Sequence, residues 1–150
     1  MLTLLFVVFL LGMVGVRLWL ANRQIRHVLS HRAEVPAEFA TRISLASHQK
    51  AADYTTARVR LGMLELVFDA AVLVGLTLLG GLQTIDLWVS SLTTHDLFRQ
   101  VLLIVVVSVL LGVLGMPFSI YRQFKLEAKF GFNRMTPKLF VSDKIGRAHV

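Results

Sequence analysis

The chain has 150 residues, of which 55% are hydrophobic and only 17% are charged. An ordinary soluble domain is about 45–50% apolar and about 25% charged, so both values deviate in the direction of membrane proteins and exclude a disordered chain. The absence of cysteine excludes a disulfide scaffold, a cysteine-ligated zinc site and a catalytic thiol. The formal charge of +7 leaves a nucleic-acid partner or a membrane surface open until the basic residues are placed.

The first apolar block covers residues 2–21, and Thr3 and Arg17 are its only polar side chains. A membrane-crossing helix needs about 20 residues, so this block predicts a transmembrane helix. Arg17 would extend its head group to the interface, where Trp19 is also favoured. A cleaved signal peptide is the alternative, although no Lys or Arg precedes the block and no small-residue cleavage site follows it.

Two further apolar blocks cover residues 61–82 and 101–120. At 1.5 Å per residue, each reaches about 30 Å, which is the thickness of a bilayer core. Both could also be buried helices of a soluble protein, but the third block lacks the polar stripe that such a helix carries. The sequence therefore predicts an all-α integral membrane protein with three transmembrane helices at about 2–21, 61–82 and 101–120.

Prolines and caps predict how the polar segments fold. The run Ala33-Glu34-Val35-Pro36 indicates a break followed by a new helix start. Residues 37–60 contain no proline or glycine and predict one long helix within a cytoplasmic loop over 22–60. Pro117 is expected to end or kink the third span.

Charge predicts the topology. Residues 22–60 carry seven Lys or Arg against three Asp or Glu, residues 83–100 carry one against two, and residues 121–143 carry five against two. Because Lys and Arg mark the cytoplasmic side, the N-terminus is expected outside, and loop 22–60 and the C-terminal segment inside. The basic residues then orient the protein and meet anionic lipid, and no aromatic-interleaved basic stripe indicates a nucleic-acid partner.

Glu65 and Asp69 lie four residues apart, so they share one face of the second span. A carboxylate inside a membrane is costly and usually faces a partner or a water-filled cavity, which makes both residues candidate cavity-lining groups. Alternatively, the membrane begins later and leaves Glu65 at the interface, paired with Arg58 or a neighbour.

His27 and His31 have the i, i+4 spacing that allows two imidazoles to bind one metal ion. The zinc-protease motif His-Glu-x-x-His needs a glutamate directly after the first histidine, and Val28 occupies that position. We therefore interpret the pair as two solvated histidines in a basic helix beside the membrane.

The segment around residues 127–143 resembles a family signature. It has Glu, Gly-Phe-Asn, Thr, an apolar pair and Asp at the positions found in the N-terminal membrane region of Ste24-type (CAAX prenyl protease) M48 zinc metallopeptidases. The run at residues 48–54, leading to Arg60 and Gly62, is similar to bacterial members. The matched signature residues are Glu127, Gly131, Phe132, Asn133, Thr136 and Asp143.

This resemblance implies a protease of the bacterial inner membrane that cleaves peptide or protein substrates in an intramembrane chamber. Zinc, bound by His-Glu-x-x-His and a later glutamate, would activate water there. The chain contains no such motif, so we expect no catalytic or metal-binding residue within it and no zinc bound by it alone. The signature residues are expected to form a structured cytoplasmic loop.

Residues 144–150 depart from the family pattern. The codons ATC GGA AGA GCA CAC GTC would encode Ile-Gly-Arg-Ala-His-Val, and that nucleotide string resembles a common sequencing adapter. We therefore expect a family N-terminal domain over residues 1–143, a non-native read-through tail over 144–150, and a truncation before the catalytic motif. A genuine basic tail, a small non-enzymatic membrane protein and a transporter fragment remain alternatives.

Overall fold

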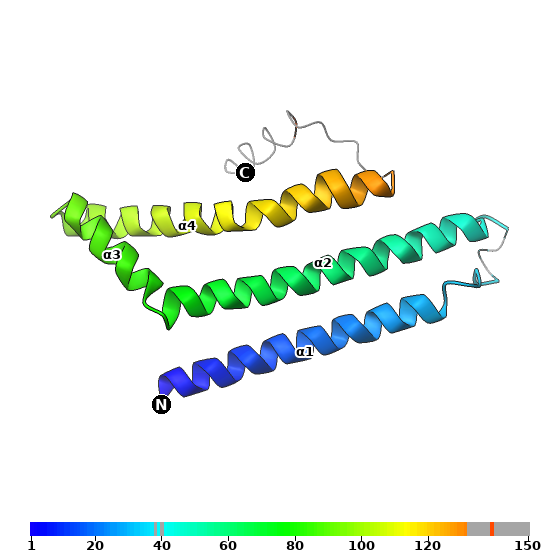
Figure 1. The fold of residues 1–150 in the computed structure, drawn as a ribbon, viewed down its shortest axis with the longest axis horizontal. Coiled ribbons are helices and arrows are strands. Elements are labelled where there is room, and N and C mark those ends of the chain that lie inside the picture. The colour runs from blue at the N-terminus through cyan, green and yellow to red at the C-terminus, as the bar shows by residue number, and fades with distance from the viewer. Residues whose placement is uncertain (38, 40, 132–138, 140–150) are drawn as a thin grey trace.

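The computed structural model describes residues 1–37, 39, 41–131 and 139. Every element in these residues is a helix, which confirms the predicted all-α membrane fold. Helices α1, α2 and α4 run side by side along the long axis, and the short α3 joins α2 to α4 at one end (Figure 1). The elements are α1 (Leu2–Ser30), α2 (Leu45–Thr77), α3 (Gly81–Leu92), α4 (Asp96–Ile120) and the π-helix η1 (Tyr121–Glu127).

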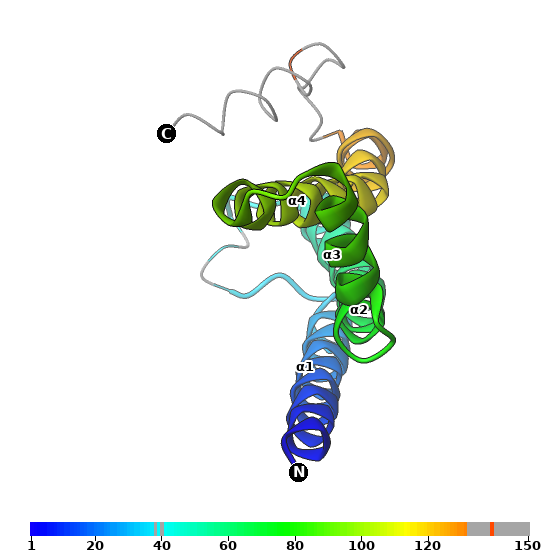
Figure 2. The ribbon, with the colours of Figure 1, turned by 90° about the vertical axis from the view of Figure 1, so that its left-hand side faces the viewer.

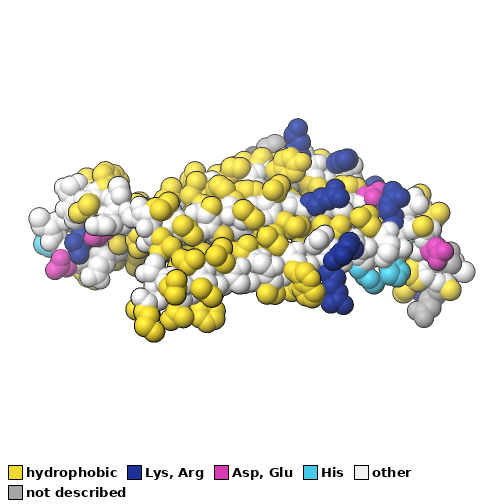
Figure 3. All heavy atoms as spheres, turned by 60° about the horizontal axis from the view of Figure 1, so that its bottom comes forward, with side chains coloured by type: hydrophobic (Ala, Val, Ile, Leu, Met, Phe, Trp, Pro, Cys, Tyr) yellow, Lys and Arg dark blue, Asp and Glu magenta, His cyan; other side chains and the backbone are white. Residues whose placement is uncertain are grey.

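The helices lie in a row with α2 in the middle, as the view along the long axis shows (Figure 2). Helix α1 packs along α2 on one side, and the η1 end of the continuous α4–η1 helix contacts α2 on the other. The row leaves broad apolar faces exposed over most of its length (Figure 3). Such faces need lipid or further protein to cover them.

Within the described residues, two helices are long and apolar enough to cross a membrane, namely α1 with 29 residues and the α4–η1 helix with 32. Only 6% and 0% of the residues in their most apolar windows are buried inside the protein, so their apolar side chains face outward. These two helices contain the first and third predicted spans, residues 2–21 and 101–120. Helices α2 and α3 together would supply a third, bent span.

The second predicted span, residues 61–82, is not one continuous helix. Helix α2 ends at Thr77, and α3 leaves it at an angle of 55° after a short break. Gly80 has a φ of +78°, a left-handed conformation that favours glycine. At Gly81 a Cβ atom would lie 2.8 Å from the carbonyl oxygen of Gly75, so the chain turns where two glycines permit it. The apolar residues on both sides of the break hide it in the sequence.

The helix predicted to start at Pro36 is also wrong. The break itself is present, but the described residues between Pro36 and Ser44 form turns, and α2 begins only at Leu45. Ser44 caps it, because its Oγ accepts a hydrogen bond of 3.2 Å from the Ser47 N–H. Pro117 does not end its helix either, since α4 continues through it to Ile120 and into η1.

Candidate functional site

Basic side chains gather at one end of the molecule, which we call the basic end: the last turns of α1, the first half of α2, and η1 with residues 128–131. Figure 3 shows Lys and Arg concentrated there, beyond a long hydrophobic middle. The opposite end holds Met1, α3 and the start of α4 (Figure 1). The fold therefore brings together the two basic segments that the sequence separates.

A hydrophobic cluster joins α2 to η1 at the basic end. Leu61, Leu126 and Phe130 are buried in it, and Tyr54, Ala57 and Phe118 pack around them. The rings of Tyr54 and Phe130 meet edge to face, with centroids 5.5 Å apart. This geometry is favourable for aromatic pairs. The cluster is the packed contact between the middle of α2 and the end of the third span.

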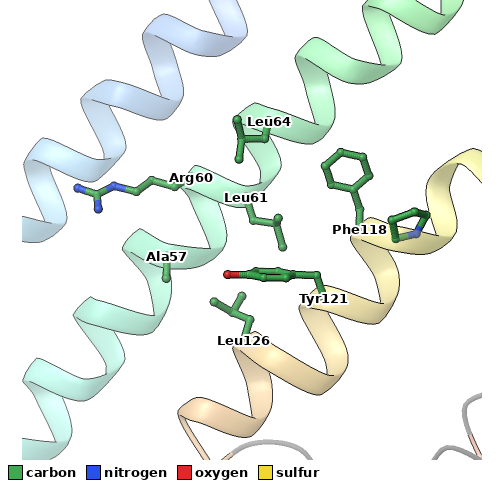
Figure 4. Close-up of a pocket in the computed structure, with 8 residues that line it drawn as sticks. Ala57, Arg60, Leu61, Leu64, Phe118, Tyr121 and Leu126 are labelled. Carbon is green, nitrogen blue, oxygen red and sulfur yellow. The ribbon is translucent and has the colours of Figure 1, made fainter.

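An apolar cleft of about 550 Å³ lies beside this cluster (Figure 4). Its volume falls in the range of about 300–1,000 Å³ that is usual for small-molecule sites. One wall comes from α2 and the other from α4 and η1. The described lining residues are Ala57, Arg60, Leu61, Leu64, Pro117, Phe118, Tyr121 and Leu126.

Glu65 forms an ion pair with Arg122, which joins α2 to η1 across 57 residues of sequence. The two side chains are 29% and 36% exposed, so water partly screens the pair. The Nε atom of Arg122 is buried without a hydrogen-bond partner in the described part of the chain. Glu65 is thus paired, but with η1 and not with Arg58.

Asp69 lies one turn deeper in α2, and its side chain is exposed on the helix surface. Neither Asp69 nor Glu65 is among the described residues that line the apolar cleft. One position earlier, Phe68 packs against Phe118 with ring centroids 5.2 Å apart. The two carboxylates therefore differ: Glu65 has a partner from η1, and Asp69 faces away from the protein.

A second ion pair connects the end of α1 to α2. The Nε and Nη2 atoms of Arg32 donate hydrogen bonds of 2.8 and 2.9 Å to the two carboxylate oxygens of Asp53. These hydrogen bonds hold the pKa of Asp53 below its usual value, and the charges of Arg32 and Lys129 add to the effect. Because both side chains are about 40% exposed, the pair orients the helices more than it stabilises them.

The histidines cap the end of α1. The rings of His27 and His31 lie 4.4 Å apart, and Nδ1 of His31 is 2.9 Å from the carbonyl oxygen of His27. From α2, Nε2 of His48 lies 2.8 Å from the carbonyl oxygen of His31. Such contacts satisfy carbonyls at a helix C-terminus. Within residues 1–37, 39, 41–131 and 139, no group of three or more His, Asp or Glu is placed to hold a metal ion.

Two of the signature residues lie among the described residues. Glu127 is the last residue of η1 and is half-buried. Gly131 has a φ of +72° and ends the helical turn that follows η1, its N–H donating a 3.1 Å hydrogen bond to the carbonyl of Ala128. Phe132, Asn133, Thr136, Asp143 and the tail at 144–150 lie outside the described residues.

The two family-like segments of the sequence meet in space. Tyr54 packs on Phe130, and a Cβ atom at Gly131 would lie 3.5 Å from Nζ of Lys50. The start of the signature therefore packs against the first half of α2. Sequence reasoning missed this contact and the Glu65–Arg122 pair, because nothing in a local pattern reports a partner so distant in the chain.

Comparisons with known proteins agree with the helical architecture. The model of the family described as "CAAX prenyl protease N-terminal, five membrane helices" matches residues 24–150. A CAAX prenyl protease 1 homolog from Dictyostelium discoideum is 69% identical over 29 residues, which are 19% of this chain and 7% of that protein. The match thus spans a small part of the relative's length. No solved structure matches the chain with statistical significance.

Proposed function

The chain belongs to the CAAX prenyl protease N-terminal family, and we propose that it is the N-terminal membrane part of a longer zinc metalloendopeptidase. The observation that carries the proposal is the family match over residues 24–150. The short match to a CAAX prenyl protease 1 homolog supports the same assignment. In this proposal the three apolar blocks anchor the enzyme in the membrane and form part of the wall of its chamber. The enzyme cleaves peptide or protein substrates inside that chamber.

Zinc is bound by other residues of that enzyme. The sequence has no His-Glu-x-x-His motif, and the described residues do not offer three ligands at one place. His27 and His31, the closest approach to a ligand pair, are engaged in the cap of α1. A zinc ion therefore does not fit this part of the fold, and no step of hydrolysis is assigned to it.

Asp69 is our candidate for a residue that lines the chamber. Its carboxylate lies well inside the helical stretch of α2 and faces outward from the described helices. A charge at membrane depth is costly unless it faces water or a partner. Exposure to a water-filled chamber, walled on its other side by further membrane helices, would satisfy it.

The signature at Glu127, Gly131, Phe132, Asn133, Thr136 and Asp143 forms a structured loop on the cytoplasmic side, with the basic end toward the cytoplasm. Support comes from the enrichment of Lys and Arg there, the usual mark of the inner face. The N-terminus and α3 then lie outside, and the membrane is the inner membrane of a bacterium.

Sequencing the gene beyond the codon for Asp143 tests the proposal. We expect a His-Glu-x-x-His motif in the same reading frame, and a stop codon with no such motif before it contradicts the enzyme assignment. The purified 150-residue chain is expected to bind no stoichiometric zinc and to cleave no peptide. Stoichiometric zinc by elemental analysis would show that the metal is held here after all.

A further inference from the structure

A smaller polar pocket adjoins the apolar cleft at the basic end. Its volume is about 350 Å³, and α1, α2 and the turn after η1 all contribute to it. It shares Ala57 and Arg60 with the apolar cleft, so the two spaces are neighbours along α2. Besides Ala57, its lining residues are Leu29, Asp53, Thr56, Arg60, Lys129 and Phe130.

The pocket has an excess of positive charge. Asp53, the one carboxylate among its described lining residues, is already held by two hydrogen bonds from Arg32. Arg60 makes no ion pair with any residue that the structure describes, and its side chain extends from α2 toward α1 (Figure 4). Lys129 lies 5.8 Å from the centroid of the Phe130 ring. Arg60 and Lys129 therefore both face the pocket, while Asp53 is already paired with Arg32.

A buried hydroxyl in the same pocket lacks a partner. Thr56 is only 6% exposed, and its Oγ1 forms no hydrogen bond within the described part of the chain. Threonines inside helices commonly bond the carbonyl four residues earlier, and an unsatisfied buried hydroxyl destabilises the fold. Thr56 lines the pocket, so a ligand that enters between Arg60 and Lys129 would bond its buried hydroxyl once the side chain turns toward the pocket.

We propose that this pocket binds the phosphate of an anionic phospholipid and that an acyl chain of the same lipid lies in the adjoining apolar cleft. Arg60 and Lys129 would pair with the phosphate, and Thr56 would donate a hydrogen bond to one of its oxygens. The acyl chain would contact Leu64 and Phe118. An anionic amphiphile fits because charge and apolar surface lie side by side at the end of the membrane helices.

Native mass spectrometry of the purified chain in detergent tests the charge requirement. Phosphatidylglycerol is expected to bind in preference to phosphatidylcholine. Arg60→Gln and Lys129→Gln should each weaken phosphatidylglycerol binding about fivefold, the effect of one cation near an anionic lipid. Arg58→Gln is the matched control, because Arg58 is exposed on the same helix and lines neither pocket. Equal losses in all three variants, or no lipid preference, would overturn the proposal.

Thr56→Val separates a binding role from a structural one. The change keeps the shape and removes the unpartnered hydroxyl, so we expect weaker phosphatidylglycerol binding with an unchanged or higher unfolding temperature. A lower unfolding temperature with unchanged binding would mean that the hydroxyl serves the fold alone.

Leu64→Trp tests the acyl chain, because the larger ring would fill the cleft from a residue that is 65% exposed. We expect this variant to bind phosphatidylglycerol more weakly and inorganic phosphate as before. Inorganic phosphate binding as tightly as the lipid, or full lipid binding by Leu64→Trp, would contradict a site that holds the acyl chain. Neither result bears on the peptidase assignment, which depends on the gene sequence and zinc content.

Discussion

Gly131 occupies a backbone conformation, with φ at +72°, that side chains disfavour. Gly131→Ala is expected to lower the free energy of unfolding by about 1 kcal/mol, the usual penalty for a left-handed residue with a Cβ atom. Because that Cβ would lie an ordinary 3.5 Å from Nζ of Lys50, the effect comes from the backbone and not from a clash. Thermal unfolding in detergent, followed by circular dichroism, measures it.

Gly112→Ala is the control for this change. Gly112 lies inside α4, and a Cβ atom there meets nothing within 4 Å, so alanine should leave the unfolding temperature unchanged or raise it. Equal losses of stability in the two variants would show that Gly131 has no special conformational role.

The charge of Asp53 makes the stability of the fold depend on pH, and the sign of that dependence follows from its lowered pKa. Its pKa is lowered in the folded state by Arg32, so the ion pair contributes stability above the ordinary carboxyl pKa. That contribution is lost as the pH falls through the lowered folded pKa. The unfolding temperature of Asp53→Asn should therefore lie below that of the parent chain at pH 7, and the difference should shrink as the pH falls below the ordinary carboxyl pKa.

Glu34→Gln serves as the comparison, because Glu34 is exposed and forms no ion pair with the residues that the structure describes. It should unfold like the parent chain across the same pH range. A difference between Asp53→Asn and the parent that does not shrink as the pH falls below the ordinary carboxyl pKa would show that the carboxylate acts through something other than its charge.

At the scale of helices, the Glu65–Arg122 pair fastens η1 to α2. Removing one partner leaves the other charge unpaired and partly buried. Because that charge is also partly exposed to water, the loss of unfolding free energy is smaller than for a fully buried pair. A double-mutant cycle of Glu65→Gln and Arg122→Gln should give a coupling energy of about 1 kcal/mol from unfolding measurements. Lys125 is an exposed residue of η1, so the cycle of Glu65→Gln with Lys125→Gln should give none. Similar couplings in both cycles would argue against a specific pair.

The helix ends show where a sequence is informative and where it is not. The apolar runs within α1 and α4 indicate long membrane helices from the sequence alone, because lipid accommodates helices with so many exposed apolar side chains. The break between α2 and α3 was missed, since Leu78, Leu79 and Leu82 continue the apolar run across it. Ser44 could have been recognised as a helix cap, but Pro36 was the stronger local signal.

At the scale of the whole molecule, the basic end makes an orientation testable. The chain has no cysteine, so single cysteines can be introduced without background. In intact bacteria that express the chain, a membrane-impermeant maleimide should label Thr94→Cys, between α3 and α4, and not Ala46→Cys at the start of α2. Both positions are exposed in the structure, so lysed cells should label both. The reverse pattern in intact cells would invert the proposed topology.

The candidate site was only partly predictable. The signature near Gly131 and the run near Tyr54 were each recognisable as family-like, but their contact was not, because packing between residues so far apart leaves no local pattern. The unpaired hydroxyl of Thr56 was equally invisible, since threonine inside a helix usually finds a backbone partner.

The sequence by itself determined that this protein is a helical membrane protein of one recognisable family, with its positive charge in two separated segments. Both properties follow from composition and order, because burial in lipid demands long apolar helices and charge resists crossing a membrane. The tertiary structure alone decided which charges pair, where α2 bends, and that the two basic segments meet around adjoining polar and apolar spaces. Those outcomes depend on the angle and register at which helices distant in the chain pack, and these are set by side-chain contacts between them.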